Sequence, residues 1–354
     1  PPALAMAESI GASGKDLILA TAIGLEISNR VSTALVSGMK GFAGGGELRV
    51  KWADRSGYAS CNFGVAATAS KIMNLGQDKM MHALGIAGHL CQVLTWVRYT
   101  FQDHRAMTKY AVPGWQNTGG VMAALLAEMG YMGDTTVFDA KEGFWKFIGY
   151  AGWNPEKMIE GLGDRWRFFD KIVFKPYPCC RMFQTDLQVF LEVLEKNGLK
   201  AEEIEGVKIL GHPTLLEPAF TNRELNSIVD IQFGPAYIFA MAANGVPKGV
   251  DWQDMELVKT PRIYDFSQKV TYTVNPRYAE TQIHLVEVVA RGQTFKGEAK
   301  FNELRDLTAE ELVGKYQHNA MKVITEDKIE SSVNTILNLE KIENVSELMS
   351  QITL

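Results

Sequence analysis

The segment FKPYPCCRMFQ, residues 174–184, combines two prolines, two adjacent cysteines and two cations. Pro176 forces Lys175 out of helical geometry, and Pro178 does the same to Tyr177, so the segment is extended and stiff. A stiff segment can present a lysine or a thiol at a fixed place, which substrate positioning requires. The structural alternative is a plain interdomain linker in which the cysteines only pack.

The chain before this segment is predicted to be mainly helical. Apolar side chains recur three and four residues apart, and alanine and glycine at such positions let helix backbones approach closely. We therefore expect a compact helical body. The predicted helices are GKDLILATAIGLEISNRVSTAL (14–35), FGVAATASKIMNL (63–75), DKMMHALGIAGHLCQVLTWV (78–97) and a shorter helix from about Gly120 to Gly130.

The chain after the segment has a different residue pattern. A helix that Gly198 closes, TDLQVFLEVLEKNG, leads into β-branched, alternating stretches with one apolar helix, GPAYIFAMAANG, between them. From Thr308, which can cap a helix before Glu311, helical spacing returns. The predicted strands lie in IEGVKILGH (204–212), QKVTYTVNPRY (268–278), TQIHLVEVVARG (281–292) and QTFKGEAKF (293–301).

These residue patterns predict a mainly α fold class in which an α+β unit is inserted into a helical body. Residues 1–168 and 302–354 would form the body, and residues 169–301 the inserted unit. A chain of 354 residues is long enough for two such units.

Composition excludes several classes of protein. Hydrophobic residues at 46% and charged residues at 22% are typical of a soluble globular chain. The formal charge of -5 comes without a polybasic run, so no nucleic-acid partner is predicted. No apolar run reaches the roughly 20 residues that span a membrane. The spacing of the four cysteines predicts neither a disulfide framework nor a zinc site, so a cytoplasmic location is the simplest expectation. The cysteines are Cys61, Cys91, Cys179 and Cys180.

Two further segments could place a pocket at a helix start. In DHRAMTKYAVPGWQNTGG (103–120), a Gly-Trp-Gln-Asn-Thr run enters the alanine-rich helix, where free backbone N–H groups could bind an anion together with Lys109. In SGYASCNFGVAATASK (56–71), Ser60 and Cys61 precede a helix of small residues. Ordinary helix capping and a buried thiol would explain both segments without a site.

Motifs of several well-known enzyme classes are missing from the sequence. The six histidines show no HExxH-like spacing, and no GxSxG elbow or Walker loop occurs. The glycine-rich GFAGGGEL (41–48) lacks the lysine of a phosphate loop, and we interpret it as a flexible loop.

Taken together, these segments resemble the MmgE/PrpD family, which includes 2-methylcitrate dehydratase, cis-aconitate decarboxylase and iminodisuccinate epimerase. The resemblance covers essentially the whole chain and is most specific in FKPYPCCR and the Gly-Trp helix start. It implies a helical domain built from both chain ends, a smaller inserted α+β lid, a homodimer, and no metal or organic cofactor. It also implies an active site between body and lid that binds a small di- or tricarboxylate. Other matching segments are SGYASCNFGVAATASKIMNLG, DIQFGPAYIFAMAANG and LTAEELVGKY.

By position, the resemblance assigns roles to individual residues. Lys109 matches an active-site lysine before the Gly-rich helix start, and Lys175 matches the lysine at the lid entrance. Cys180 falls where some members place a histidine. Lysines suit this substrate class because they neutralise carboxylates and the enolate-like charge that develops when a proton leaves the adjacent carbon. The predicted catalytic residues are Lys109, Lys175, Cys180 and Tyr58, and the predicted substrate-binding residues are Ser60, Cys61, Tyr177, Arg181, Gln184 and Gln232.

The chain departs from the family pattern at positions of proton transfer. Gly57, Tyr58 and Ala59 stand where dehydratases of the family commonly carry Gly-Phe-His, and Gln184 stands where the family has a histidine. The family's Asp- and His-containing segment would lie upstream of PPALAMAES, where the numbering begins. A thiol nucleophile beside a cation is a further alternative. The remaining candidates for proton transfer are Tyr58, Tyr177 and Cys180.

The sequence therefore predicts a cofactor-independent lyase or isomerase that removes a proton α to a carboxylate of a small polycarboxylate. The missing histidines would protonate a departing hydroxide, so their loss favours isomerisation or epimerisation over dehydration. The alternatives are a 2-methylcitrate-type dehydratase or hydratase, and a non-catalytic polycarboxylate binder of the same family.

Overall fold

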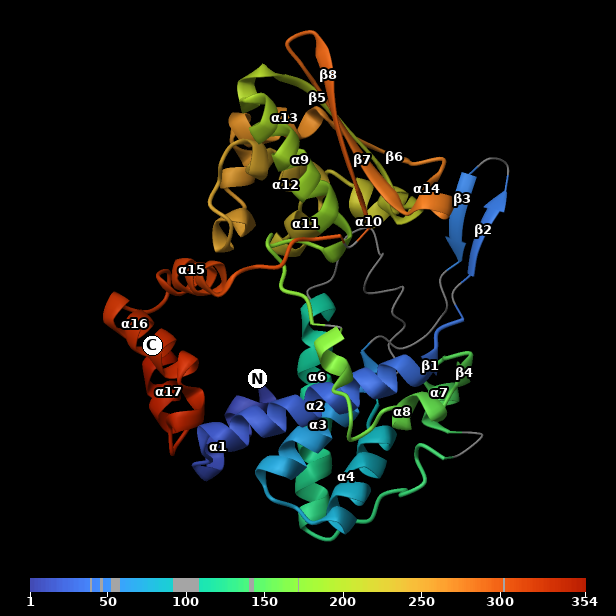
Figure 1. Ribbon diagram of the computed structural model, residues 1–354, viewed down its shortest axis with the longest axis vertical. Helices are drawn as coiled ribbons and strands as arrows, with labels where there is room; N and C mark the ends of the chain where they lie inside the picture. Colours follow the sequence, from blue (N-terminus) through green and yellow to red (C-terminus); the bar gives the residue numbers. More distant parts are fainter. Residues whose placement is uncertain are drawn as a thin grey trace.

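The structure is a computed structural model that describes residues 1–38, 40–44, 47–51, 58–91, 108–139, 143–170, 172–301 and 303–354, with the backbone alone for 40–44, 47–51 and 108–113. Figure 1 shows a helical body in blue and green, an α+β unit in yellow-green to orange, and red C-terminal helices beside both. The predicted mainly α class agrees with this architecture. The boundaries at 168 and 301 and the role of the α+β unit as a lid stay predictions.

The helical body is organised around one central helix, α3 (Ala59–Ile72), which packs on α2, α4 and α6. Helix α2 starts at a capping box in which Ser13 Oγ accepts a hydrogen bond from Asp16 N at 3.2 Å. The other helices here are α1 (Pro2–Ile10), α2 (Gly14–Ala34), α4 (Gln77–His89), α6 (Thr108–Glu128), α7 (Phe144–Phe147) and α8 (Glu156–Ile159).

Helices α2 and α3 cross at a glycine contact. A Cβ atom on Gly24 would lie 1.9 Å from Thr68 Oγ1, and one on Gly64 would lie 2.4 Å from the Gly24 carbonyl oxygen. No side chain fits between the two backbones at this point. The small residues of the sequence thus allow the close helix approach that was expected of them.

A buried ion pair fastens α2 to the segment that follows α8. Arg30 Nε lies 2.6 Å from Glu26 Oε1, with the two side chains 1% and 8% exposed. The Arg30 guanidinium also donates to the carbonyl oxygens of Met158, Glu160, Gly161 and Arg165. Because each guanidinium nitrogen of Arg30 finds a partner, the last turn of α8 and the residues after it are held against α2.

Two sequence-based expectations for this half are wrong. Residues 41–44 and 47–48 are not a loop, since β2 (Lys40–Gly44) pairs antiparallel with β3 (Glu47–Lys51). Cross-strand backbone pairing forms this hairpin despite the glycine content. The helix expected from about Gly120 begins twelve residues earlier, at Thr108, so Pro113 does not delimit it. A two-stranded ribbon of β1 (Leu35–Val36) and β4 (Gly152–Trp153) completes this half.

The α+β unit contains a four-stranded sheet in the order β6-β5-β7-β8. Strands β5 and β6 run parallel, β5 and β7 antiparallel, and β7 and β8 form a hairpin. Arg291 and Gly292 form its two-residue turn, both with positive φ, 53° and 67°. The strands are β5 (Ile204–Gly211), β6 (Val270–Val274), β7 (Ile283–Ala290) and β8 (Gln293–Lys300), which lie within the four predicted stretches.

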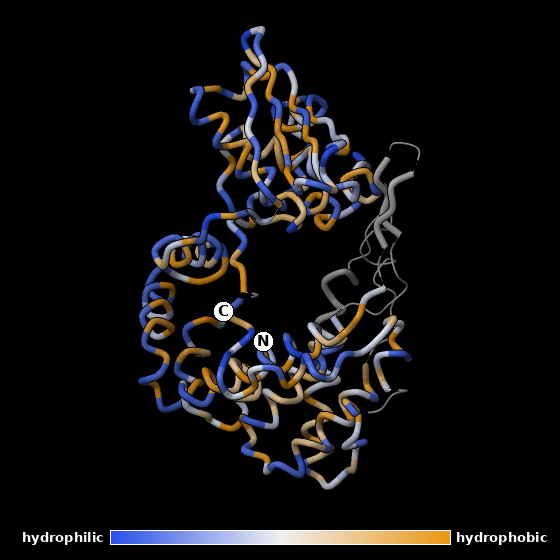
Figure 2. The backbone as a smooth tube through the Cα atoms, turned by 45° about the vertical axis from the view of Figure 1, so that its right-hand side comes forward, coloured by the Kyte–Doolittle hydropathy of each residue, from blue (hydrophilic) through white to orange (hydrophobic). Residues whose placement is uncertain are grey.

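Helix α9 (Gln184–Asn197) lies against β7 and β8 and ends at Gly198 in the left-handed conformation, as predicted. Leu187 and Phe190 on its buried face join Ile209 and Val286 of the sheet in one core. Figure 2 shows this unit with hydrophobic strands and a hydrophilic tip at the β7–β8 turn. The remaining helices are α10 (Pro218–Thr221), α11 (Ile228–Phe233), α12 (Pro235–Ala243), α13 (Pro261–Gln268) and α14 (Tyr278–Thr281).

The two ends of the chain pack together. Gly14 N donates to the Ile342 carbonyl oxygen at 3.0 Å, and Val345 N donates to the Ala12 carbonyl oxygen at 2.9 Å. Val345 is also buried in one cluster with Met6. The C-terminal helices are α15 (Ala309–Ala320), α16 (Glu326–Leu337) and α17 (Ser346–Ile352), and Thr308 caps α15 in the predicted capping box with Glu311.

Within the described ranges, no helix is both long and apolar enough to cross a membrane. The same ranges contain no cluster of three or more His, Cys, Asp or Glu side chains that could hold a metal ion.

Candidate functional site

Gln184 fixes the conformation of the 175–179 segment. Its side chain is fully buried, and its Oε1 accepts a hydrogen bond from Tyr177 N at 3.1 Å. Its Nε2 donates to the carbonyl oxygens of Tyr177 at 2.9 Å and Cys179 at 3.2 Å. One amide therefore satisfies three backbone groups of a segment in which two residues are prolines without an N–H. We call these three hydrogen bonds of the Gln184 side chain the Gln184 clamp. They reinforce the stiffness that the prolines predict.

Lys175 lies at the entrance to the α+β unit and is exposed. Its Nζ donates to the Cys179 carbonyl oxygen at 3.2 Å, so the ammonium folds back over its own segment. Its carbonyl oxygen accepts a hydrogen bond from Lys315 Nζ of α15 at 2.7 Å. The position of Lys175 is thus set from both sides, by Gln184 through the segment and by α15 through the backbone.

Tyr177 is 6% exposed and forms the apolar support of the segment. Its ring stacks on Trp252, with 6.3 Å between centroids and 18° between planes, and Lys248 Nζ lies 4.8 Å from its centroid. Burial is the main cause that raises the pKa of Tyr177 to about 12. The phenol therefore stays protonated at neutral pH and can donate a proton or a hydrogen bond.

The two cysteines have different environments. Cys179 is buried, and burial raises the pKa of its thiol well above the ordinary value, so this sulfur is not an activated nucleophile. Cys180 is half-buried, and its backbone N–H donates to the Gln232 carbonyl oxygen at 3.0 Å. The side-chain Oε1 of Gln232 is buried and has no partner among the described residues. Such an acceptor costs roughly 1–3 kcal/mol unless a ligand or water satisfies it.

The second group of predicted residues lies at the start of α3. Tyr58 is the residue that precedes the helix, with φ 61° and 41% exposure. Ser60 is buried in the first turn, and Cys61 is half-buried with its Sγ 3.9 Å from the Ser28 hydroxyl. Burial raises the pKa of Cys61. Tyr58 is therefore the most accessible polar side chain of this group.

The prediction that Lys109 stands before a helix start is wrong, because it lies in the first turn of α6 and the Gly-Trp run lies inside that helix. The Gly-Trp run therefore offers no free N–H groups to an anion. The side chain of Lys109 lies outside the described residues, as does Gly57.

The structure brings one set of predicted residues together at the entrance of the α+β unit: Lys175, Tyr177, Cys180, Arg181, Gln184 and Gln232. It places Tyr58, Ser60 and Cys61 on α3 in the helical body. That these two groups face one substrate stays a prediction.

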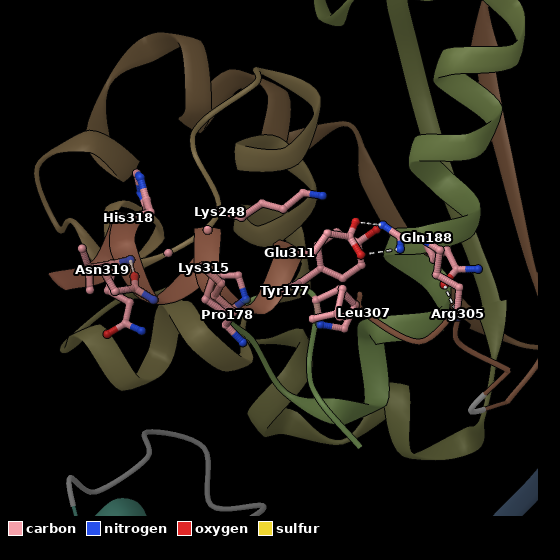
Figure 3. A pocket seen from close by; sticks show the side chains of 15 residues that line it. Tyr177, Pro178, Gln188, Lys248, Arg305, Leu307, Glu311, Lys315, His318 and Asn319 are labelled. Carbon is pink, nitrogen blue, oxygen red and sulfur yellow. Dashed lines mark hydrogen bonds and ion pairs between the residues drawn. The ribbon is translucent and has the colours of Figure 1, made fainter. Parts of the chain in front are cut away.

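Sequence reasoning missed a cavity of about 410 Å³ beside the segment. Figure 3 shows it between the α+β unit and α15, with Tyr177 and Pro178 on one wall and Lys315 on another. Lys248 and Arg305 also line it. Lys248 lies more than fifty residues before Arg305 and Lys315, and the three cations belong to no common motif, so the sequence could not have indicated that they share a cavity.

Comparisons with known proteins agree with the segments identified above. The MmgE/PrpD N-terminal domain model matches residues 1–154, and the C-terminal domain model matches residues 177–341. The chain is 24% identical to the cis-aconitate decarboxylase-like protein oryM of Aspergillus oryzae, covering 96% of this chain and 72% of that protein. It is also 24% identical to cis-aconitate decarboxylase of Homo sapiens, covering 95% of this chain and 68% of that enzyme.

Proposed function

The chain belongs to the MmgE/PrpD family, and from this premise we propose that it is a cofactor-independent lyase or isomerase that acts on a small di- or tricarboxylate. The observation that carries the proposal is the double fixation of Lys175, by the Gln184 clamp and by α15. A cation whose backbone is held this firmly can meet a carboxylate with little loss of conformational entropy.

The proposed chemistry passes through negative charge on a carbon next to a carboxylate. A base removes the proton from this carbon, and its electron pair spreads onto the carboxylate oxygens. Lys109 and Lys175 bind the substrate carboxylates and stabilise the developing charge. The carbanion then expels a leaving group or takes a proton on the opposite face. Tyr58, Tyr177 and Cys180 are the proposed proton donors, and the raised pKa of Tyr177 keeps its phenol in the form that can donate.

A second candidate within this class is decarboxylation, which the names of the two relatives favour. There the bond between the carbon and a departing carboxylate breaks, CO₂ leaves, and the electron pair that remains on carbon takes a proton. The demands on the site are the same cations and a proton donor, without a base that abstracts a carbon-bound proton. The homodimer expected from the family stays a prediction, which a molar-mass measurement in solution would test.

The proposal is tested by turnover of a panel of di- and tricarboxylates that includes cis-aconitate and 2-methylcitrate. CO₂ release identifies decarboxylation, a new ultraviolet absorbance identifies dehydration, and hydrogen exchange in D₂O without an unsaturated product identifies isomerisation. We expect Lys175→Ala to lower kcat/KM by about 100- to 1000-fold, because a preorganised charge is lost. Lys259→Ala, an exposed lysine paired with Glu256, should leave turnover unchanged.

The contrary outcome is equally specific. If the unmodified protein binds a panel member, loses that binding in Lys175→Ala and yet turns over none of them, the chain is a non-catalytic polycarboxylate binder. Full activity of the folded Lys175→Ala protein would remove Lys175 from the mechanism.

A further inference from the structure

The cavity beside the Lys175 segment shares Tyr177 with the proposed reaction, and its other walls come from parts of the chain that the reaction does not use. Pro176, Tyr177 and Pro178 form one wall, and Lys248 and Gln253 come from the stretch after α12. Helix α15 supplies the third wall with Lys315 and Asn319 (Figure 3). Lys175 itself does not line the cavity.

The carboxylates around this cavity already have cations of their own. Both terminal guanidinium nitrogens of Arg305 donate to the Glu311 carboxylate. This contact is the main cause that lowers the pKa of Glu311 to about 2. Asp251 lies 2.8 Å from His318 Nε2 and 3.0 Å from Lys322 Nζ. Acidic side chains near the cavity are therefore ionised and neutralised.

Two lining lysines remain without such compensation. Among the described residues, neither Lys248 nor Lys315 forms an ion pair. Lys248 Nζ lies 4.8 Å from the centroid of the Tyr177 ring and also interacts electrostatically with Glu311. Lys315 uses one donor on the Lys175 carbonyl oxygen. Burial and, secondarily, the charge of Lys175 lower the pKa of Lys315. The Lys315 ammonium is therefore partly desolvated and lies near a second cation.

We propose that this cavity is a second anion site, which shares the Tyr177 wall with the active site proposed above and binds a small polyanion carrying phosphate or carboxylate groups between Lys248 and Lys315. Two ammonium groups suit a ligand with two acidic groups, and about 410 Å³ is ample for one of that size. The Tyr177 ring and Pro178 give it an apolar wall, and Gln253 offers an amide.

A ligand in this position would connect the α+β unit to α15. Polar contacts already join them, since Asn319 Oδ1 accepts a hydrogen bond from Val250 N at 3.1 Å and Lys315 bonds to Lys175. An anion held by Lys248 on one side and Lys315 on the other adds a further bridge next to the residue that we propose to hold substrate. The site is thus placed to couple anion binding to the position of Lys175.

The proposal is tested by calorimetric titration of the full chain with pyrophosphate at low ionic strength, and with citrate in a second arm. Lys248→Gln and Lys315→Gln remove the charges, and glutamine at 315 can still donate to the Lys175 carbonyl oxygen. We expect each substitution to weaken binding about fivefold and the double variant about 25-fold, since one such ion pair contributes roughly 1 kcal/mol. Lys259→Gln, which removes a lysine outside the cavity, should bind as the parent does.

The two arms also identify the ligand chemistry and the site. Binding of pyrophosphate alone assigns a phosphate ligand, and binding of citrate alone in a manner sensitive to Lys248→Gln assigns a carboxylate ligand. Pyrophosphate binding that survives Lys175→Ala, the substitution that we expect to lower kcat/KM strongly, supports a separate site. The proposal is overturned if neither anion binds at millimolar concentration, or if the folded double variant binds as tightly as the parent. Loss of pyrophosphate binding in Lys175→Ala would place the anion in the active site instead.

Discussion

At the scale of single residues, Gln184 has the clearest role. It was predicted to bind substrate because it stands where relatives carry a histidine. The structure shows its amide fully buried and engaged by Tyr177 and Cys179. We expect it to position Lys175 rather than to touch substrate, whereas Gln232, with its unpartnered buried oxygen, is better placed to receive a ligand.

The clamp predicts the effect of Gln184→Ala. Truncation leaves buried backbone groups of Tyr177 and Cys179 without partners, so the free energy of unfolding should fall by about 1–3 kcal/mol. Urea denaturation followed by circular dichroism measures this change. The exposed Gln293→Ala should stay within about 0.5 kcal/mol of the parent, and equal stability of the two variants would contradict the clamp.

At the scale of elements, the helix pattern was predictable and the helix ends were less so. Helices α2 and α3 and the four strands of the sheet follow from apolar periodicity. The start of α6 does not, because the helix begins at Thr108, whereas a start near Gly120 was expected. The β2–β3 hairpin was also not predicted, because it depends on cross-strand pairing, which composition does not indicate.

The α2–α3 crossing predicts opposite effects for two Gly→Ala substitutions. Gly64→Ala would push a methyl group into the Gly24 backbone and should destabilise the fold by about 1–3 kcal/mol. Gly114→Ala, in α6 with open space around it, should stabilise by roughly 0.5–1 kcal/mol, since alanine favours the helix. Thermal unfolding of both variants measures these changes. A Gly64→Ala protein as stable as the parent would show that the two helices can move apart without loss of stability.

At the scale of the whole molecule, contacts between residues far apart in sequence hold the body together. The chain ends meet through Gly14 and Ile342, and α2 holds the loop at 158–165 through Arg30. Sequence periodicity indicates neither contact, because each joins positions separated by more than a hundred residues.

The Arg30 anchor predicts a large effect for Arg30→Met. The substitution leaves Glu26 buried without its cation and the loop carbonyl groups without donors, so we expect a loss of about 3–5 kcal/mol. Lys157→Met, which breaks an exposed pair with Glu160, should change stability by less than about 1 kcal/mol. Chemical denaturation compares the two, and similar small losses would refute a structural role for the buried pair.

The family, the mainly α class, the α+β character of the middle of the chain and the stiffness of FKPYPCC could be predicted from the sequence. The family follows from its motifs, and the other features follow from local periodicity and proline geometry. The contacts of that stiff segment, in contrast, are visible only in the folded chain. Gln184 and Lys315 fix Lys175 through hydrogen bonds that depend on α9 and α15 lying on either side of it. The cavity with Lys248 and Lys315 likewise exists only because folding brings two isolated lysines to the same walls.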